Sequence, residues 1–369
     1  MATVHVFINA NGVFIKKTMD YVENNAPKKH YYFVQQGSVE GIPEAQLLTS
    51  CIQIETMIQA GSIDQVLFHS LHYFQFRWLL HLKRSYSNLK LSWMFWSFEY
   101  YQMSFAVGRM YAPFSRQFLT RKLLFNIWEN LVHFVKGNSL TILPISKKKY
   151  LHVVNQVDQF CSFNSMDFEY VYGNDTKVKY LFMPYLDELD LFVQTNAFIQ
   201  KNRIMVGHNG SPLLNHVETL AYLNTCSIQQ KIILPLNYGK ADYIQKLKAE
   251  LKTFEHLTID TLNEPMAMAD YYAYVSDVEY FLLNSYCQQG LGNIIYFLFN
   301  HSTVYLSEKS SSYHYFRQLG FNLKSIEQLM SGENLSPISD EEKSNNRTRV
   351  LEHFNREKVL SQWEKMLVD

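Results

Sequence analysis

Two hydrophobic periodicities alternate along this chain. Short apolar runs that are typical of buried strands precede stretches in which apolar residues recur at helical spacing. In the second half, the pattern predicts strands at 204–206, 232–236, 257–259, 279–283 and 303–306. It predicts helices at 212–224, 241–254, 266–275 and 293–299. Repetition of strand, helix and strand predicts a parallel sheet covered by helices on both faces.

The first half repeats this alternation less regularly. Strands are predicted at 4–8, 31–34, 66–68, 91–96 and 151–154, with helices at 15–24 and 72–85 among them. A polar, irregular stretch near the chain midpoint separates the halves, and the charged C-terminal end keeps helical spacing. The predicted domains are therefore an N-terminal domain 1–185, a linker 186–202, a C-terminal domain 203–336, and a helical segment 337–369 that closes the fold.

Charge, cysteine content and the length of apolar runs exclude several classes of protein. The 34 basic and 34 acidic residues balance to zero formal charge, and no basic block suggests a nucleic-acid partner. Four scattered cysteines indicate reduced thiols and no zinc site. The strand-like N-terminus does not resemble a signal peptide, and no apolar run reaches the ~18 residues of a membrane span. We expect a cytoplasmic protein that meets a membrane only peripherally, at its inner face.

Two glycine-bearing turns are the main chemical signal. In "VGHNGSPLLNH", residues 206–216, a predicted strand ends at Gly207 and Gly210, and Ser211 and Pro212 open a helix. Such a turn either connects strand and helix or offers backbone amides to a phosphate. "CQQGLGN", residues 287–293, also follows a strand and opens a helix. Together the two turns predict a diphosphate held at helix N-termini without a metal.

Ordered motifs resemble a known family. They are "VGHNGSPLLNH", "ILPLNYG" followed by "YIQKLK", "DVEYF" and "QQGLGN", preceded by "LFHS" and "WMFWSFEYY". The chain resembles the family-56 glycosyltransferases of bacterial surface-polysaccharide pathways, which are TDP-N-acetylfucosamine:lipid-intermediate N-acetylfucosaminyltransferases or 4-alpha-L-fucosyltransferases. The resemblance implies the GT-B fold, an α/β fold with two facing Rossmann-like domains and a cleft between them. Cys287 stands where the family carries Arg, and Glu99 where it carries Asp, so the sugar or acceptor can differ.

Site roles follow from the turns and the resemblance together. The candidate donor-binding residues are Gly207, Asn209, Gly210, Ser211, Tyr238, Gln289, Gly290, Gly292 and Asn293. Tyr238 either packs on the nucleotide or covers the core. For the catalytic base we predict Glu99, and we expect its aromatic neighbours to raise its pKa by desolvation. His69 is the rival base. Each of these two side chains has a structural alternative, a surface glutamate or a buried histidine.

The family's acceptor is lipid-linked, which directs attention to residues 116–137, "RQFLTRKLLFNIWENLVHFVKG". Its apolar stripe and flanking basic residues suit a helix lying on a bilayer surface. The same pattern also suits a core helix. Lys147–Lys149 either adds attraction to anionic lipid or forms a solvated loop.

We therefore predict a metal-independent, inverting glycosyltransferase that needs no cofactor. It would move a deoxyamino or related sugar from a dTDP- or UDP-linked donor to a lipid-linked or glycan acceptor, as in O-antigen synthesis. Two alternatives remain open. One is a nucleotide-sugar epimerase on the same fold, and the other is a non-catalytic scaffold that binds a partner glycosyltransferase.

Overall fold

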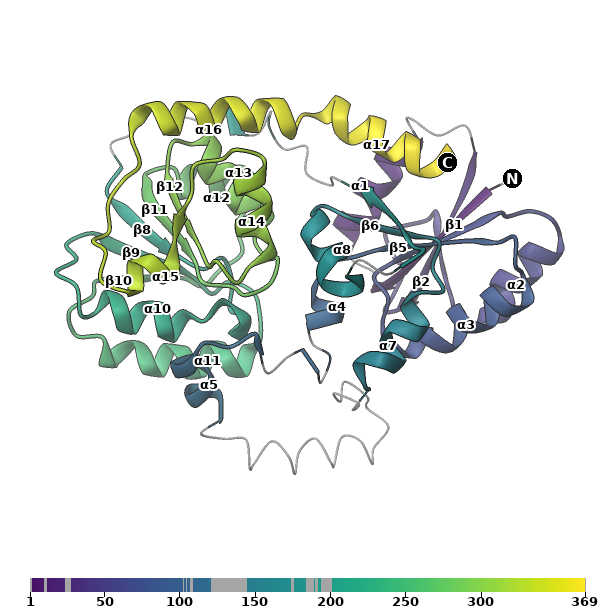
Figure 1. Ribbon diagram of the computed structural model, residues 1–369, viewed down its shortest axis with the longest axis horizontal. Helices are drawn as coiled ribbons and strands as arrows, with labels where there is room; N and C mark the ends of the chain where they lie inside the picture. Colours follow the sequence, from purple (N-terminus) through teal and green to yellow (C-terminus); the bar gives the residue numbers. More distant parts are fainter. Residues whose placement is uncertain are drawn as a thin grey trace. The chain divides into compact units, whose positions relative to one another are not determined.

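The computed structural model describes residues 2–9, 12–23, 28–101, 103, 105–106, 109–120, 145–173, 176–183, 189, 192–193 and 201–368. The chain forms two compact units. Unit 1 comprises the described parts of Met1–Tyr100, Ile145–Asp187 and Arg356–Asp369. Unit 2 comprises the described parts of Tyr101–Pro144 and Glu188–Asn355. Each unit is built on one parallel sheet with helices packed against it (Figure 1).

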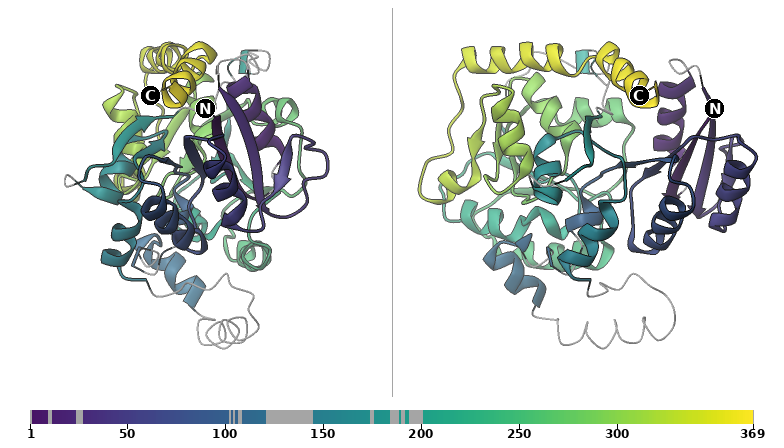
Figure 2. Two further views of the ribbon diagram at one scale, coloured as in Figure 1. Left: turned by 90° about the vertical axis from the view of Figure 1, so that its right-hand side faces the viewer. Right: turned by 45° about the vertical axis from the view of Figure 1, so that its right-hand side comes forward.

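The described strands of unit 1 form a parallel sheet in the order β3-β2-β1-β4-β5-β6-β7. The strands are β1 (Ala2–Asn9), β2 (Lys29–Gln36), β3 (Ala45–Leu47), β4 (Gln65–His69), β5 (Lys90–Met94), β6 (Gln159–Ser162) and β7 (Lys179–Phe182). The helices are α1 (Gly12–Glu23), α2 (Cys51–Gln59), α3 (Phe76–Ser85), α4 (Phe98–Tyr101), α7 (Lys147–Val154), α8 (Ser165–Tyr172) and α17 (Arg356–Val368), with the 3-10 turn η1 (Tyr73–Gln75). The central strands are buried on both faces because helices cover both (Figures 1 and 2).

The C-terminal helix α17 completes the core of unit 1. Its Trp363 and Val359 are buried with Tyr21 of α1, Leu67 of β4 and Met94 of β5. Lys90 also donates a hydrogen bond to the carbonyl of Met366, over 3.3 Å. The last helix is therefore part of the hydrophobic core of the first sheet's unit.

One predicted strand is a helix. Residues 151–154, "LHVV", are rich in β-branched residues and suggested a strand, but they form the second half of α7. Ser146 caps this helix by accepting a hydrogen bond from the Lys149 amide, and Tyr150, Val153 and Val154 are buried at helical spacing. Three lysines at the start of the helix obscured that stripe. The next strand of the sheet is β6.

The described strands of unit 2 form a parallel sheet in the order β10-β9-β8-β11-β12-β13. The strands are β8 (Arg203–Val206), β9 (Lys231–Pro235), β10 (Ile259–Leu262), β11 (Val278–Leu283), β12 (Thr303–Leu306) and β13 (Lys324–Ser325). The helices are α5 (Pro113–Thr120), α10 (His216–Leu223), α11 (Ala241–Glu250), α12 (Met268–Tyr274), α13 (Leu291–Phe299), α14 (Ser311–Gln318), α15 (Ile326–Met330) and α16 (Asp340–His353), with the 3-10 turns η3 (Pro212–Leu214) and η4 (Leu251–Thr253). All five strands and four helices predicted for 204–306 are present, within a few residues of the predicted ends.

Both faces of this second sheet are covered. α10 and α11 lie on one face, where Leu220 and Leu247 pack against Ile204 and Val206. α13 lies on the other face, where the rings of Phe281 and Phe297 are 4.6 Å apart. The near-complete burial of α13 explains why its sequence is apolar on all sides.

The described part of the predicted linker 186–202 belongs to unit 2, where Phe192 is buried with its ring 5.0 Å from that of Tyr272. The units differ from the predicted domains at two further places. The described residues after Tyr100, up to Thr120, belong to unit 2, although the prediction assigned them to the domain 1–185. The amides of Ala112 and Phe114 donate to Asn215 and Glu218 at 2.9 and 2.7 Å, which ties this segment to α10. The second difference is α17, which belongs to unit 1, whereas α16 belongs to unit 2. In both cases a segment packs against residues that are far from it in sequence. Local periodicity does not reveal such contacts.

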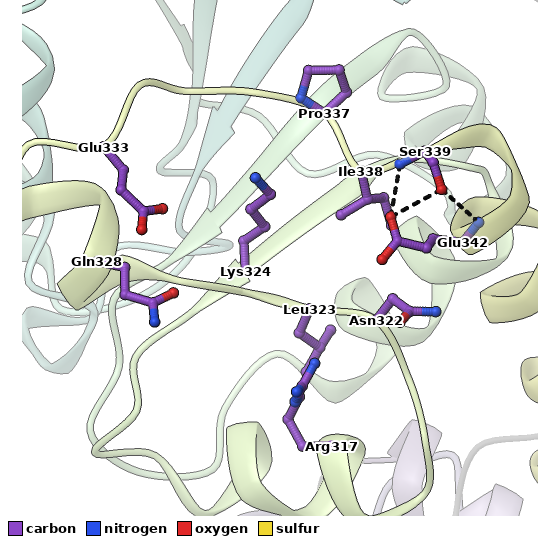
Figure 3. A pocket seen from close by; sticks show the side chains of 10 residues that line it. All are labelled: Arg317, Asn322, Leu323, Lys324, Gln328, Glu333, Pro337, Ile338, Ser339 and Glu342. Carbon is purple, nitrogen blue, oxygen red and sulfur yellow. Dashed lines mark hydrogen bonds between the residues drawn. The ribbon is translucent and has the colours of Figure 1, made fainter.

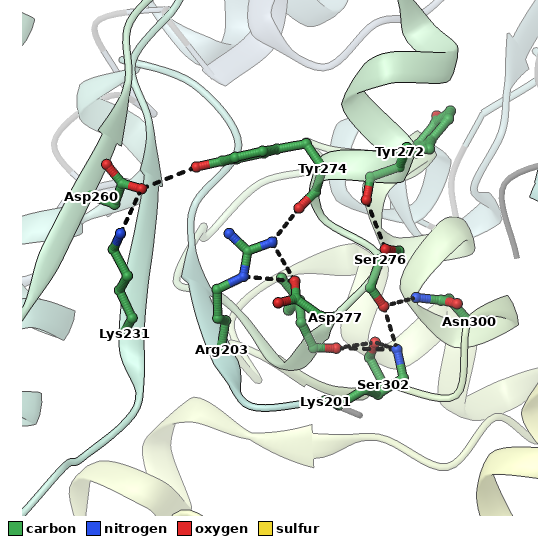
Figure 4. Close-up of polar contacts among 12 residues, drawn as sticks. Lys201, Arg203, Lys231, Asp260, Tyr272, Tyr274, Ser276, Asp277, Asn300 and Ser302 are labelled. Atoms are coloured by element: carbon green, nitrogen blue, oxygen red, sulfur yellow. Dashed lines mark hydrogen bonds and ion pairs between the residues drawn. The ribbon is translucent and has the colours of Figure 1, made fainter. Parts of the chain in front are cut away.

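The amino-terminal edge of the second sheet is held by a polar network (Figure 4). Lys201 donates to the carbonyl of Ser276 at 2.8 Å, and Arg203 Nε donates to Asp277 at 2.6 Å. Burial lowers the pKa of Lys201 to about 8. These contacts join the starts of β8 and β11. Ligands of open parallel sheets bind at the opposite, carboxyl edge.

Candidate functional site

The carboxyl edge of the unit 2 sheet contains a topological switch point. β8 lies between β9 and β11, and the chain winds outward from β8 to β10 before returning to β11. The loops after β8 and β11 therefore leave the sheet side by side and lead in opposite directions. Ligands of open parallel sheets bind in the crevice at such points. Both glycine-bearing turns follow these two strands.

The first turn uses most of its own backbone amides. The Gly207 amide donates to Leu282 at 2.9 Å, and the Gly210 amide to Tyr238 at 2.7 Å. Ser211 donates its amide to Asn209 Oδ1 at 2.8 Å. Ser211 Oγ accepts from Leu213, which caps the short 3-10 turn η3 rather than an α-helix. Ser211 and Pro212 therefore open a helical turn as predicted, but the expectation of free amides there is wrong, and α10 begins only at His216.

The glycines of this turn permit a close backbone approach. Gly210 and Gly239 form an isolated parallel bridge. A Cβ on Gly239 would lie 2.5–2.7 Å from backbone atoms of Gly210, and a Cβ on Gly210 would overlap the Ile244 side chain. The bridge holds Tyr238 at the carboxyl edge, where the residue is 54% exposed. An exposed ring there suits stacking on a planar ligand.

The second turn does provide a helix N-terminus. Gly290 is the N-cap of α13 in the left-handed conformation, with φ +64°, and no side chain caps that helix. The first amides of an α-helix have no partner within the helix, and they carry its positive dipole end. Gln289, Gly290, Gly292 and Asn293 are all half-buried, so the turn reaches the surface. The second turn, at the start of α13, is therefore better placed than the first turn to bind an anion.

The two turns meet through His208. A Cβ on Gly290 would lie 3.0 Å from His208 Nδ1. The imidazole is 8% exposed, and its Nε2 lies 3.1 Å from Asn209 Nδ2. Burial lowers its pKa to about 4, so the ring is neutral near pH 7. The prediction that the two turns lie together is thereby supported, although His208 was missing from the predicted site.

Other side chains orient the second turn. Tyr271 donates to Asn293 Oδ1 at 2.5 Å, which leaves Asn293 Nδ2 as the donor end of that amide. Gln289 Nε2 lies 3.5 Å from the Cys287 sulfur. In the loop after β12, Lys309 donates to the Tyr286 hydroxyl at 3.2 Å and lies over that ring. Lys309 is a cation near the turn that periodicity gave no reason to select.

Asn215 and His216 are structural. Both are fully buried. Asn215 is left-handed, accepts from the Ala112 amide and donates to the Asn284 carbonyl at 2.9 Å. His216 lies 3.0 Å from the Tyr243 hydroxyl. They hold α10 and the segment before α5 behind the first turn.

In unit 1, Glu99 lies in α4, just beyond the carboxyl end of β5. It is 2% exposed. Its Oε1 accepts hydrogen bonds from the Trp96 amide at 3.0 Å and the Trp93 indole at 3.2 Å, and Oε2 is buried without a hydrogen-bond partner. Burial raises the pKa of Glu99 to about 7, and the charge of nearby Asp167 adds to the shift. The surface-glutamate alternative is therefore wrong.

His69 also lies at a strand end of unit 1, but it is held by other rings. Its Nε2 is 3.0 Å from His5 Nδ1, and its ring stacks on Phe7 at 4.0 Å. Trp363 of α17 stacks on it at 6.4 Å. Burial lowers the pKa of His69 to about 3, which makes it a weak proton acceptor. These contacts favour the structural alternative for His69.

The predicted membrane-facing segment 116–137 lies mostly outside the described residues. Its described part, 116–120, ends α5, where Phe118 and Leu119 pack against the unit 2 core. Lys147–Lys149 are exposed at the start of α7. Within the described ranges, no helix is long and apolar enough to cross a bilayer. In the same ranges, no group of three His, Cys, Asp or Glu side chains is arranged to hold a metal ion.

A cavity of about 340 Å³ lies elsewhere in unit 2, between β13 and the start of α16 (Figure 3). The residues lining it are Arg317, Asn322, Leu323, Lys324, Gln328, Glu333, Pro337, Ile338, Ser339 and Glu342. Ser339 and Glu342 hydrogen-bond each other as a capping box, which occupies that helix N-terminus. None of the predicted site residues lines this cavity.

Comparison with known proteins agrees with this geometry. The family model described as 4-alpha-L-fucosyltransferase, glycosyl transferase group 56, matches residues 152–340. No curated protein matches the chain in sequence.

Several solved structures share the fold. A glycosyltransferase from Rickettsia africae is 10% identical over 100% of this chain and 99% of its own, with a TM-score of 0.65. HepE from Anabaena, in complex with UDP and glucose, is 9% identical over 100% and 99%, with a TM-score of 0.63. The N-terminal domain of a Candida albicans trehalose-6-phosphate phosphatase is 11% identical over 99% and 95%, with a TM-score of 0.65. At such identities the likeness establishes the fold, which is GT-B with two Rossmann-like domains.

Proposed function

The chain belongs to the 4-alpha-L-fucosyltransferase family, glycosyl transferase group 56, and from that premise we propose its donor, acceptor and mechanism. The donor is a dTDP- or UDP-linked deoxyamino or related sugar. The acceptor is a lipid-linked intermediate or glycan of bacterial surface-polysaccharide synthesis, reached at the inner face of the cell membrane. Cys287 and Glu99, where the resembled family carries Arg and Asp, are the reason to leave the sugar open.

The observation that carries the donor proposal is the contact between the two glycine turns at the β8–β11 switch point. Gly290 and His208 bring the uncapped start of α13 against the loop after β8. Oriented N–H donors in such a place can stabilise the negative charge that develops on a leaving diphosphate. Because these donors are fixed before the reaction, the leaving group needs no metal ion in this proposal. HepE, whose structure holds UDP, has the same fold.

We propose the remaining contacts to the nucleotide sugar from the positions of residues near the two turns. Tyr238 stacks on the nucleotide base, and Asn293 Nδ2 donates to the diphosphate. The first turn contributes less through its amides than through its shape, since the amides of Gly207, Gly210 and Ser211 already have partners. Lys309 supplies a positive charge near the second turn.

Transfer proceeds by direct displacement with inversion. The acceptor hydroxyl oxygen forms a bond to the anomeric carbon while the bond from that carbon to the diphosphate oxygen breaks. Glu99 takes the hydroxyl proton, and the nucleoside diphosphate leaves with the bonding electron pair. A carboxylate whose pKa is near 7 is suited to this role, because it is both available as a base and strong enough to accept the proton.

Thermal denaturation with dTDP, UDP, GDP and CMP, each in the presence of EDTA, tests the donor proposal. A ligand that binds only the folded state stabilises it by about 2.7 kcal/mol at one hundred times its Kd. We expect dTDP or UDP to raise the Tm and the chelator to leave that shift unchanged. If none of the four nucleotides moves the Tm, the donor assignment is overturned, and if the shift requires a metal, the metal-independent mechanism is.

A further inference from the structure

Lys309, in the loop after β12, is a cation that an aromatic ring holds in place. Its Nζ lies 4.3 Å from the centre of the Tyr286 ring and donates to the Tyr286 hydroxyl at 3.2 Å. Within the described ranges Lys309 forms no ion pair, whereas Lys28 and Lys83 each pair with an aspartate. An ammonium has three hydrogens to donate, so two of them have no partner among the residues that the structure describes.

The ring beneath Lys309 does not cancel its charge. Tyr286 is buried, and burial raises the pKa of its hydroxyl. The phenol is therefore neutral near pH 7, and it accepts the hydrogen bond as a neutral group. A lysine that binds an anion normally loses much side-chain freedom. Because the ring and the hydroxyl already restrict the Lys309 side chain, less freedom remains to be lost on binding.

The loop that carries Lys309 is fastened at both of its ends. Glu327 at the start of α15 accepts from the Ser307 hydroxyl at 2.5 Å and from the next backbone amide at 2.8 Å. At the other end, the Ser310 hydroxyl donates to the Cys287 carbonyl at 3.4 Å. Cys287 opens the second turn, so this bond joins the loop to the turn that leads into α13. Lys309 is therefore exposed, yet it is fixed beside the second turn.

The strand order places Lys309 at one end of a row of proposed donor contacts. Tyr238 follows β9, the glycine turns follow β8 and β11, and Lys309 follows β12. These strands are neighbours in the order β9-β8-β11-β12. Three strand spacings of about 4.8 Å separate β9 from β12, roughly 14 Å in all. With the base on Tyr238, the phosphates extend over the turns towards β12, and the phosphate farthest from the base lies nearest to Lys309.

We propose that Lys309 binds the terminal phosphate of the nucleoside diphosphate and selects diphosphate-linked over monophosphate-linked donor sugars. Tyr286 and Glu327 are the positioning residues that hold its amine there. This inference rests on the proposed function and deepens it. A nucleoside monophosphate ends one phosphate short of Lys309, so it lacks the charge-assisted hydrogen bond that the ammonium donates. The same contact stabilises the charge that the terminal phosphate gains when its bond to the sugar breaks.

Calorimetric titration with UDP and UMP, and with dTDP and dTMP, in EDTA tests this selection. We expect wild type to bind the diphosphate of its preferred nucleoside more tightly than the monophosphate. Lys309→Met should lose about 10-fold in affinity for the diphosphate, as when a hydrogen bond to a charged group is lost, and less than about twofold for the monophosphate. Lys309→Arg keeps a cation and should stay within about threefold of wild type. Lys248→Met, at an exposed lysine of α11, is the matched control and should change neither affinity.

A double-mutant cycle tests the positioning role of Tyr286. Tyr286→Leu removes the ring and the hydroxyl that hold the amine, so it should weaken diphosphate binding by about three- to tenfold when Lys309 is present. In the Lys309→Met background the same substitution should leave binding unchanged, because no amine remains to be held. A loss of equal size in both backgrounds would show that Tyr286 acts through the shape of the turn, and its positioning role would be refuted.

Failure of this inference and failure of the proposed function give different results. If wild type binds neither nucleoside diphosphate, the proposed function fails and this inference fails with it. If wild type binds one of them no better than its monophosphate, the selection by Lys309 is refuted and the proposed function stands. The same holds if Lys309→Met weakens both ligands alike or neither, or if Lys248→Met causes the same loss.

Discussion

At the scale of the residue, Glu99 is the clearest case of an environment that changes the pKa of a side chain. Its carboxyl group is buried beside Trp93 and Trp96, and burial raises its pKa to about 7. If Glu99 is the base, Glu99→Gln should lower kcat by about 100- to 10,000-fold, the usual contribution of general-base catalysis. Gln keeps an oxygen for the Trp93 and Trp96 donors, so the Kd for UDP or dTDP should stay within about twofold. A turnover number that is unchanged would contradict the assignment.

The same carboxyl group makes a signed prediction for stability. Its pKa is higher in the folded protein than the ordinary value of 4.5, so protonation favours folding. Its stabilising contribution is complete below about pH 4.5 and is lost as pH rises through about 7. At about 1.4 kcal/mol per pKa unit, the loss is roughly 3 kcal/mol. Urea denaturation should therefore find Glu99→Gln equal to wild type near pH 4.5 and more stable at pH 8. Parallel pH profiles of the two proteins would refute the raised pKa.

Gly239 tests the close backbone approach at the first turn. Its φ is +131°, and a Cβ would meet the backbone of Gly210, which has no flexible end to move aside. Gly332 is the matched control, since its φ is +114° and nothing lies within 4 Å of its missing Cβ. Both Ala variants carry the strain of a positive φ, about 1–2 kcal/mol, and Gly239→Ala should lose at least about 2 kcal/mol more. Equal free energies of unfolding in the two variants would show that the approach is not needed.

Sequence alone located the two turns and the glutamate at a strand end. It did not locate His208, which lies between the two turns, or Lys309, which lies near the second. Glycine spacing after a strand is a local signal, so Gly207, Gly210 and Gly290 were found. His208 was passed over because one histidine between glycines says nothing about burial. Lys309 was missed for a different reason, because its position near Tyr286 depends on the order of strands in the sheet.

At the scale of the element, α17 shows how a chain end can belong to a distant core. Trp363 and Val359 are buried among residues of α1, β4 and β5. Trp363→Ala should destabilise unit 1 by about 3–5 kcal/mol, as large-to-small changes in cores do. Leu351→Ala on α16 is the control, since Leu351 is exposed. Hydrogen exchange should accelerate in β4 and not in β11. Equal acceleration in both strands would mean that the destabilisation is not confined to unit 1, whose core contains α17.

Periodicity predicted the elements of unit 2 well because each strand and helix there is bounded by its own turn. It did less well in unit 1. α7 resembled a strand because Val153 and Val154 favour strands locally, and packing against the sheet overrode that preference. β6, α8 and β7, which are short, were not predicted. The assignment of α17 to unit 1 depends on a contact between residues more than 300 positions apart, as in the ion pair of Arg356 with Asp20.

At the scale of the whole molecule, two parallel sheets divide the proposed work. Unit 2 carries the switch point with the glycine turns, and unit 1 carries Glu99. The similarity to GT-B structures extends over nearly the whole chain, so both Rossmann-like domains are part of the likeness. Because the proposed diphosphate donors all lie in unit 2, we expect nucleotide recognition to belong to that unit alone.

Hydrogen exchange with and without UDP or dTDP, in EDTA, tests that claim most directly. We predict that the effective nucleotide slows exchange of amides at 206–213 and 287–296, at the ends of β8 and β11, and leaves the strands of unit 1 unchanged. Slower exchange confined to unit 1, or to the cavity beside β13, would contradict the proposed diphosphate site. So would a bound nucleotide that leaves the amides at the start of α13 exchanging as before.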